Sequence, residues 1–333
     1  MPQDPAPQKP PPAQLSDEDE EDNFKEGKVI VTSKYNWTVV KLLGDEGRFG
    51  MVYQVKNEDG TEGAMKVEYG TNRRQHRELK MELAILKKVT TLKHFTKVID
   101  RGRKEEEHKI YYIIVVQLVG RNLYDLKSSR SQKVFSFATA LGVAHQCLEG
   151  LEEMHKHGFI HRDLRPQYFA CGLATEKHVI YIIDFGIARK YVDSNNELKA
   201  PRDSMGFKGN VRFAPLACHR GIERSPKDDC ESWFYMLVDF INPAGLPWRK
   251  VNDRNDTMRL KEEICHGRTD NPLYGDLKHT KELAKILGYI SQLQYHSRVD
   301  YSFIYKLLAR AGNSAEVNIE APYDWETSDE TKT

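Results

Sequence analysis

The sequence predicts an α+β protein with two lobes, a small β-rich lobe followed by a larger and mainly α-helical lobe. Three observations predict this arrangement. Apolar runs between residues 34 and 117 are short, rich in β-branched residues and bounded by glycine, which is typical of strands. Apolar residues after position 122 recur at helical spacing. Motifs rich in glycine, lysine and aspartate lie on both sides of this change, which favours a site between the lobes.

The chain is expected to form one folded domain over residues 34–328, with a small lobe at about 34–117 and a large lobe at about 122–328. Residues 1–33 are predicted to be a disordered tail, because they are rich in proline and then in acidic residues and have little apolar surface to bury. Residues 329–333 are predicted to be a short C-terminal tail.

Composition limits the classes of function. The chain has 333 residues, 39% of them hydrophobic, and a net charge of +1, so no global field attracts nucleic acid or a membrane surface. The longest apolar run, IYYIIVVQLV from Ile110, is too short to span a bilayer and predicts a buried strand. Five cysteines without metal-binding spacing indicate reduced thiols. A monomer is therefore expected in the cytoplasm, with the nucleus as the alternative location.

The elements follow in order along the chain. Three runs, WTVVKLLG, GMVYQVKN and TEGAMKVEYG, predict strands of the small lobe. The next segment, HRELKMELAILKKV, places Leu79, Leu83 and Leu86 at helical spacing and predicts a helix. In the large lobe, FATALGVAHQCLEGLEEMHKHG predicts a long helix that Gly158 ends. The segment ESWFYMLVDFI is apolar nearly all round, as a buried helix is.

A glycine-rich turn between the first two strands, LLGDEGRFGMVYQV, is suited to phosphate binding. Glycine lets backbone N–H groups approach phosphate oxygens closely. Gly47, Gly50 and Val52 fit the pattern G-x-G-x-x-G-x-V, but Asp45 stands where its first glycine belongs and Gly44 lies one place early. The carboxylate of Asp45 would oppose phosphate binding. The alternative interpretation is a hairpin that contains glycines.

The strand segment GAMKVE brings a lysine to the same region. Lys66 is suited to holding the α- and β-phosphates of a nucleotide if a carboxylate fixes its ammonium group. Glu82, in the following helix, is the expected partner, and Glu78 is the alternative one turn earlier. The structural alternative is a surface lysine and a solvated helix glutamate.

Two aspartates occur in motifs of the large lobe. Asp163 lies in HRDLRPQYF, which is close to the catalytic-loop pattern H-R-D-L-x-x-x-N. Asp184 ends the apolar strand VIYIID and precedes Phe185 and Gly186. A carboxylate at a strand end before glycine is suited to a magnesium ion that bridges β- and γ-phosphates. The triplet D-F-G alone is common by chance. Here it follows the H-R-D motif by about twenty residues, and this combination is not expected by chance.

These four motifs, in this order, resemble those of a eukaryotic protein kinase, and the chain is identified as a member of the casein kinase 1 group, most similar to its tau-tubulin kinase branch. The resemblance covers roughly residues 35–328. The A-P-E motif that usually follows the activation segment is incomplete in this chain, because Leu216 stands in place of its glutamate. The segments that carry the resemblance are LKMELAILKK, QLVGRNLYDL, GFIHRDLRPQYFACG, IDFGIARKY, PRDSMGFKGNVRFAP, KDDCESWFYMLVDF, LPWRK and APYDWE.

The resemblance implies a two-lobed protein kinase fold that uses ATP and Mg²⁺ to phosphorylate serine or threonine in a protein substrate. Asp163 would orient the substrate hydroxyl and accept its proton. Asp184 would hold magnesium, Lys66 paired with Glu82 would hold the phosphates, and Arg165 would contact the γ-phosphate.

The same resemblance places the adenine and the substrate. Ala64 and Val116, the latter as gatekeeper, would line the adenine pocket, and adenine would bond the Gln117 carbonyl and the Val119 N–H. The substrate-side positions are Arg212 and Asn210. Arg212 matches a basic residue that binds acidic or phosphorylated side chains in this group. A surface arginine is the alternative for Arg212, because Asn252, the second expected basic position, is not basic. The resemblance implies acidic, phospho-primed or cytoskeletal proteins as substrates. It also implies that Asp229 has a structural role and braces the catalytic loop.

The chain departs from the pattern at one important position. Tyr168 stands where an asparagine carbonyl oxygen normally binds one of two magnesium ions, and a neutral phenol is a poor ligand for Mg²⁺. The adjacent Gln167 has an amide oxygen that could bind Mg²⁺, but neighbouring side chains in a loop usually point in different directions. Arg165 replaces a lysine and Asn210 a threonine.

Three interpretations of function follow. The first is a serine/threonine kinase with one well-held metal ion, whose activation segment needs no phosphorylation. The second is a pseudokinase that binds nucleotide or a partner, and the third is an ATP-dependent enzyme outside protein phosphorylation. We favour the first, because Lys66, Glu82, Asp163 and Asp184 are all present.

Overall fold

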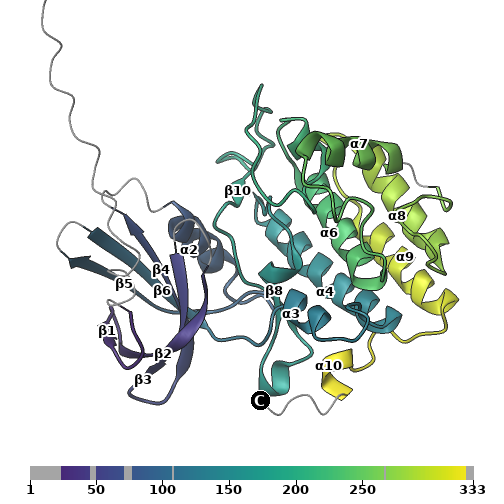
Figure 1. Cartoon of the computed structure of the whole chain (residues 1–333). Helices are drawn as coiled ribbons and strands as arrows, with labels where there is room; N and C mark the ends of the chain where they lie inside the picture. The colour runs from purple at the N-terminus through teal and green to yellow at the C-terminus, as the bar shows by residue number, and fades with distance from the viewer. Residues whose placement is uncertain (1–23, 46–49, 71–76, 107–108, 266–267, 328–333) are drawn as a thin grey trace, which may run out of the picture.

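A computed structural model of the chain describes residues 24–45, 50–70, 77–106, 109–265 and 268–327. It has a small lobe and a large lobe joined by a short connection (Figure 1). The small lobe is a six-stranded antiparallel sheet in the order β1-β2-β3-β4-β6-β5, with helix α2 beside it. Its elements are β1 Val29–Val31, β2 Asn36–Asp45, β3 Gly50–Asn57, β4 Glu62–Gly70, α2 Glu78–Val89, β5 Val98–Glu106 and β6 Lys109–Gln117.

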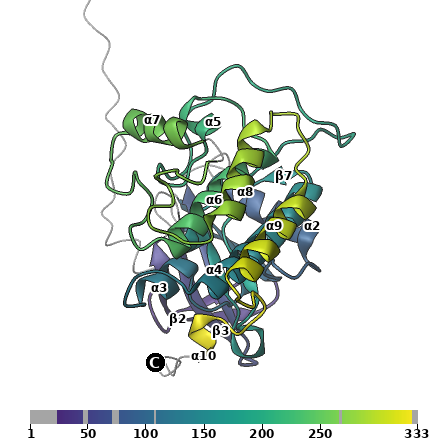
Figure 2. The ribbon, with the colours of Figure 1, turned by 90° about the vertical axis from the view of Figure 1, so that its right-hand side faces the viewer.

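The large lobe is mainly helical, which confirms the predicted fold class. In Figure 2, α6 runs through its middle, and it packs against α4 and α8. The helices are α3 Leu123–Ser128, α4 Phe137–Lys156, α5 Leu216–His219, α6 Pro226–Ile241, α7 Arg254–Ile264, α8 Thr280–Gln292, α9 Tyr301–Ser314 and α10 Asp324–Thr327. Short strands and 3₁₀ turns complete it: β7 Phe159–Ile160, η1 Pro166–Tyr168, β8 Phe169–Cys171, η2 Ala174–Glu176, β9 Ile180–Ile182 and β10 Arg189–Lys190.

The predicted buried elements are where the patterns placed them. The run from Ile110 forms most of β6, in the sheet between β4 and β5, and its last two residues lie beyond the end of the strand at Gln117. The segment ESWFYMLVDFI lies in α6, whose residues 228–241 are all buried. In α2, the buried apolar face is formed by Leu79, Ile85, Leu86 and Val89, with Leu83 at its edge. No helix in the described part of the chain is long and apolar enough to cross a membrane.

The folded small lobe begins earlier than predicted, so the boundary at residue 34 is wrong. Phe24 is buried against Tyr53 and Tyr111, and β1 pairs with β2 with Ile30 opposite Trp37. A strand of three residues with one buried side chain is too short to produce a recognisable sequence pattern.

Asp100 of β5 fixes this first segment. Its Oδ2 accepts hydrogen bonds from the backbone N–H groups of Lys34 and Tyr35, at 3.2 and 3.1 Å, and from Trp37 Nε1 at 3.2 Å. The hydroxyl of Thr32 donates to the same oxygen. One buried carboxylate therefore ties the start of the lobe to the far edge of its sheet.

Candidate active site

The motifs from both lobes meet at one cavity of about 530 Å³. Lys66 and Glu82 reach it from the small lobe, and Asp163 and Asp184 from the large lobe. The residues that line it are Gly50, Met51, Lys66, Val67, Glu68, Glu78, Leu79, Glu82, His161, Asp163, Tyr168, Asp184, Gly186, Ile187, Phe207, Lys208 and Gly209.

Lys66 pairs with Glu82, the expected partner. The Lys66 ammonium nitrogen lies 2.9 Å from Glu82 Oε1, and both side chains are almost fully buried. Lys66 also donates to the Ile183 carbonyl, which belongs to the large lobe. A buried lysine with these two acceptors has a fixed direction, and its charge is available to an anion in the cavity.

Asp184 is held at the end of the strand segment that precedes it. The Gly186 N–H donates to Asp184 Oδ1 at 2.7 Å, and the intervening Phe185 is buried against Phe95. A Cβ on Gly186 would lie 3.3 Å from the side chain of Glu78, so this close approach suits glycine.

The carboxylate of Asp184 fits a magnesium ion that takes its other ligands from phosphates and water, as Mg²⁺ does in phosphoryl-transfer sites. The described residues contain no group of three or more His, Cys, Asp or Glu side chains able to hold a metal by themselves. A metal at this place would therefore depend on bound nucleotide.

The start of the catalytic loop is braced by Asp229 of α6. Asp229 Oδ2 accepts from the His161 N–H at 2.6 Å and lies 2.9 Å from His155 Nε2, and its Oδ1 accepts from the Arg162 N–H at 2.9 Å. Burial raises the pKa of Asp229, but its contacts with His155 and with the loop outweigh this and lower it overall. Arg162 has a φ of 74°, so these bonds hold the loop in a strained conformation.

Asp163 follows this braced segment and faces the activation segment. Its Oδ1 accepts from the backbone N–H of Asn210 at 2.9 Å. Gly209 approaches so closely that a Cβ there would lie 3.0 Å from the Arg162 carbonyl oxygen. Burial raises the pKa of Asp163, while the charge of Arg165 opposes the rise. A carboxylate with a raised pKa is better suited to accept a proton.

Tyr168 lines the cavity, as its sequence position suggests, and it is coupled to Arg165. The Arg165 guanidinium carbon lies 4.0 Å from the centre of the Tyr168 ring, and the guanidinium donates to the Tyr168 hydroxyl. Arg165 Nε also lies 4.0 Å from Asp163 Oδ2. Gln167 does not line the cavity, and its buried side-chain oxygen has no hydrogen-bond partner in the described structure. The geometry therefore gives no support to Gln167 as a replacement ligand.

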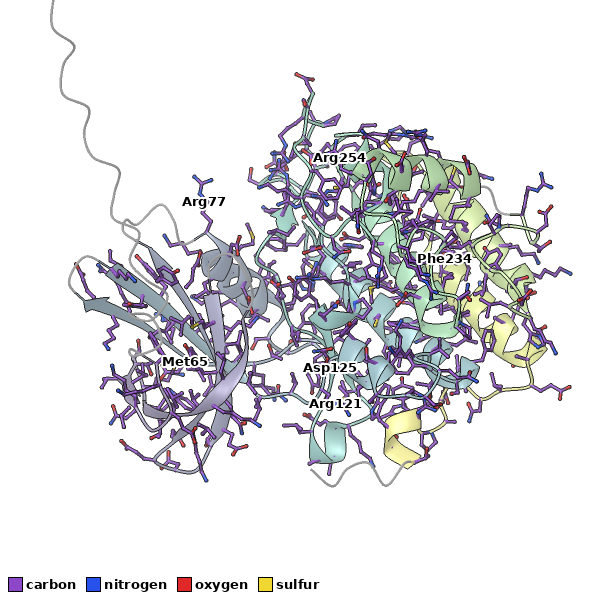
Figure 3. All side chains as sticks on the ribbon, in the orientation of Figure 1. Met65, Arg77, Arg121, Asp125, Phe234 and Arg254 are labelled. Atoms are coloured by element: carbon purple, nitrogen blue, oxygen red, sulfur yellow. The ribbon has the colours of Figure 1, made fainter. Side chains whose placement is uncertain are left out.

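The residues expected around adenine are not among those that line this cavity. Val116 is buried and pairs with Ala64 across the sheet, and Val52 pairs with Lys66. The Gln117 side chain donates to Glu176 at 3.0 Å. Val119, the other residue expected to contact adenine, lies in the connection between the lobes. The chain then continues through Arg121 into α3, which contains Asp125 (Figure 3).

The glycine-rich turn is only partly described. Gly47 and the side chain of Asp45 lie outside the described residues. Gly44 pairs with Val52 across β2 and β3. At Gly50 a Cβ would lie 2.8 Å from the Val67 carbonyl oxygen, so glycine is required for close packing of the strands.

Arg212 and the side chain of Asn210 lie apart from the catalytic cluster. Asn210 contacts Asp163 through its backbone, and its side-chain oxygen accepts from the Arg212 N–H at 2.9 Å. Arg212 is exposed, and its guanidinium donates to the Arg249 carbonyl at 3.3 Å. Asn210 thus contacts Asp163 through its backbone N–H.

Sequence reasoning missed the anchor of the activation segment. The buried ammonium of Lys261 in α7 donates to the carbonyls of Val211 and Ala214, at 2.9 and 2.6 Å. It also lies 5.0 Å from the ring centre of Trp248. The segment is thus held without the A-P-E glutamate. The sequence gives no signal for this, because a lysine in a charged helix is usually solvated.

Comparisons with known proteins agree with this geometry. Residues 37–299 match the protein kinase domain family, and the chain belongs to that family. It is 33% identical over 305 residues to a probable serine/threonine-protein kinase of Dictyostelium discoideum, covering 91% of this chain and 58% of that protein. It is 29% identical over 303 residues to the serine/threonine-protein kinase spe-6 of Caenorhabditis elegans, covering 90% of this chain and 77% of that protein. The chain thus spans little more than half the length of the Dictyostelium relative.

Proposed function

We propose that this chain is a serine/threonine protein kinase of the casein kinase 1 group, closest to the tau-tubulin kinase branch. The observation that carries the proposal is the convergence of the Lys66–Glu82 pair, Asp163 and Asp184 on one cavity. The names of the two relatives support serine/threonine specificity. So does the basic residue Arg165, two places after Asp163.

Each residue has a defined part in this function. Lys66 binds nucleotide phosphates, with Glu82 holding its ammonium in place. Asp163 orients the substrate hydroxyl and accepts its proton, and the Asn210 N–H holds the Asp163 carboxylate. Asp184 would hold Mg²⁺, which neutralises phosphate charge when it is bound.

A pseudokinase is the second candidate, and Tyr168 is the observation that favours it. Its ring lies in the cavity beside Asp163 and Asp184. Loss of one group that stabilises transition-state charge lowers a rate by ~10²–10³, which slows turnover without abolishing it. We therefore favour the enzyme, since the four groups with direct parts in transfer are all in place.

Two measurements separate these candidates. Because a ligand of the native state raises its stability, ATP with Mg²⁺ should raise the melting temperature of the chain. Radiolabelled ATP should then transfer phosphate to casein-like proteins. Asp163→Asn should keep the thermal shift and lose ~10²–10⁴ in transfer rate. Asp270→Asn, a change to an exposed aspartate in a surface ion pair, is the matched control. A thermal shift with no transfer would identify a pseudokinase.

Acidic or phosphorylated segments are the proposed substrates, with cytoskeletal proteins suggested by the nearest branch. Arg212 is exposed, and its guanidinium donates to the backbone carbonyl of Arg249, whose sequence neighbour Lys250 is also exposed, so cations are available near this point of the surface. Arg212→Ala should raise KM for an acidic or phosphorylated peptide by roughly tenfold and leave kcat nearly unchanged. A neutral peptide of the same length is the control. Equal effects on both peptides would contradict the proposed preference.

The activation segment is proposed to need no phosphorylation. The buried carboxylate of Glu223 accepts from Arg202 at 3.1 Å and lies 3.7 Å from Arg189. Glu223 thus neutralises cations that could otherwise bind a phosphate on the segment. Phosphatase treatment should leave activity unchanged, and complete loss of activity would contradict this proposal.

A further inference from the structure

We propose that Arg165 and Tyr168 act as one unit that takes the place of the second magnesium ion of a kinase site. The unit supplies a fixed positive charge beside Asp163, and the nucleotide is held with a single divalent ion at Asp184. This inference rests on the proposed function. It concerns a pair of residues that the sequence presents as two separate defects.

The two side chains are bound to each other. The Arg165 guanidinium lies over the Tyr168 ring at 4.0 Å and donates to the Tyr168 hydroxyl. Cation–π contact and a hydrogen bond between the same two side chains restrict the rotation of both. Each residue therefore determines where the other lies.

The backbone fixes Tyr168 next to the strand that leads to Asp184. Tyr168 ends the 3₁₀ turn Pro166–Tyr168, where its N–H donates to the Arg165 carbonyl at 2.9 Å. Its carbonyl accepts from the Ile183 N–H at 3.0 Å. With the backbone tied on both sides, the ring remains in the cavity unless its side-chain torsions change.

A second ion does not fit this arrangement. Mg²⁺ needs hard oxygen ligands in near-octahedral geometry, and the phenol is neutral and already accepts a hydrogen bond from Arg165. The guanidinium charge repels a cation beside Tyr168. Asp184 keeps a carboxylate in the cavity for one ion, but position 168 offers nothing to a second.

The unit can do part of what the missing ion does. Arg165 Nε is buried, has no hydrogen-bond partner in the described structure, and lies 4.0 Å from Asp163 Oδ2. The Arg165 side chain is 29% exposed and lies behind Tyr168 and Asp163 rather than among the residues that line the cavity. The positive charge held beside Asp163 attracts the phosphate charge of a bound nucleotide through space, as a second cation would.

Counting bound ions tests the inference directly. Mn²⁺ is titrated into the full chain saturated with the non-hydrolysable analogue AMP-PNP, and free Mn²⁺ is measured by electron paramagnetic resonance. We expect one bound Mn²⁺ per wild-type chain and two per chain of the double variant Arg165→Lys/Tyr168→Asn. Tyr168→Asn alone should also gain a second ion, more weakly, because the Arg165 charge remains. If the double variant does not fold, the ion count of the single variant Tyr168→Asn tests the inference instead.

Each outcome has a distinct meaning. Two ions on wild type, or one on both variants, would overturn the inference and leave the proposed kinase function intact. One ion on wild type without phosphate transfer to any protein substrate would overturn the proposed function alone. Failure of wild type to bind AMP-PNP would overturn both.

Transfer rates provide a second readout. Arg165→Met removes the charge and should lower kcat by ~10²–10³ while the ion count stays at one. Arg268→Met, a change to an exposed arginine in a surface pair with Asp270, is the matched control and should change neither quantity. The double variant Arg165→Lys/Tyr168→Asn should restore kcat to within tenfold of wild type and make it depend on a second Mg²⁺ addition. An Arg165→Met rate equal to wild type would contradict the inference.

Discussion

The two halves of the catalytic loop are built differently. In the first half, residues 161–163, backbone and side-chain groups are held by Asp229 and by the Asn210 N–H. In the second half, residues 165–168, Arg165 and Tyr168 are held mainly by each other. Buried polar atoms without a hydrogen-bond partner in the described structure occur in both halves: His161 Nε2 in the first, and Arg165 Nε and Gln167 Oε1 in the second.

This difference shows which part of the loop depends on the fold. The first half follows the kinase pattern because its hydrogen bonds come from the buried interior of α6, where a change leaves buried groups unpaired. In the second half the side chains of Arg165 and Tyr168 contact each other, so these two residues can change together with little cost to the fold. Substitutions that remove the brace of the first half should therefore cost more stability than substitutions in the second half.

Asp229→Ala should have the largest effect on stability. It leaves the N–H groups of His161 and Arg162 and the ring of His155 without their acceptor in a buried site. Loss of one member of a buried charged pair typically costs about 3–5 kcal/mol. Urea unfolding of wild type and variant measures this cost. A loss below about 1 kcal/mol would show that the first half does not depend on this brace.

Acidification should weaken the same brace. The folded-state pKa of Asp229 is lowered, so its stabilising effect is present above the unfolded pKa of about 3.8 and is lost as pH falls through the folded value. Asp229→Asn does not titrate. The stability difference between wild type and Asp229→Asn should therefore shrink as pH falls below about 4. A difference that stays constant from pH 7 to pH 3 would contradict this assignment.

Sequence patterns predicted the fold class, the helices α2, α4 and α6, and the four residues Lys66, Glu82, Asp163 and Asp184 that line the cavity, because these depend on periodicity and on short motifs. They also predicted Glu82, in the middle of its helix, as the partner of Lys66. Contacts between distant residues gave no such signal. The stack of Arg165 on Tyr168, the Lys261 anchor and the Asp100 bonds to the first strand each depend on tertiary packing.

Gln167→Leu should have the smallest effect and the opposite sign to Asp229→Ala. The Gln167 side-chain oxygen is buried without a partner in the described structure, and burying such a group costs free energy that an apolar side chain of similar size avoids. We expect the free energy of unfolding to stay the same or to rise by about 1 kcal/mol, with phosphate transfer unchanged. Urea unfolding and the transfer assay measure the two quantities. A loss of stability near that of Asp229→Ala would mean that both halves of the loop are equally tied to the interior, and the contrast between them would fail.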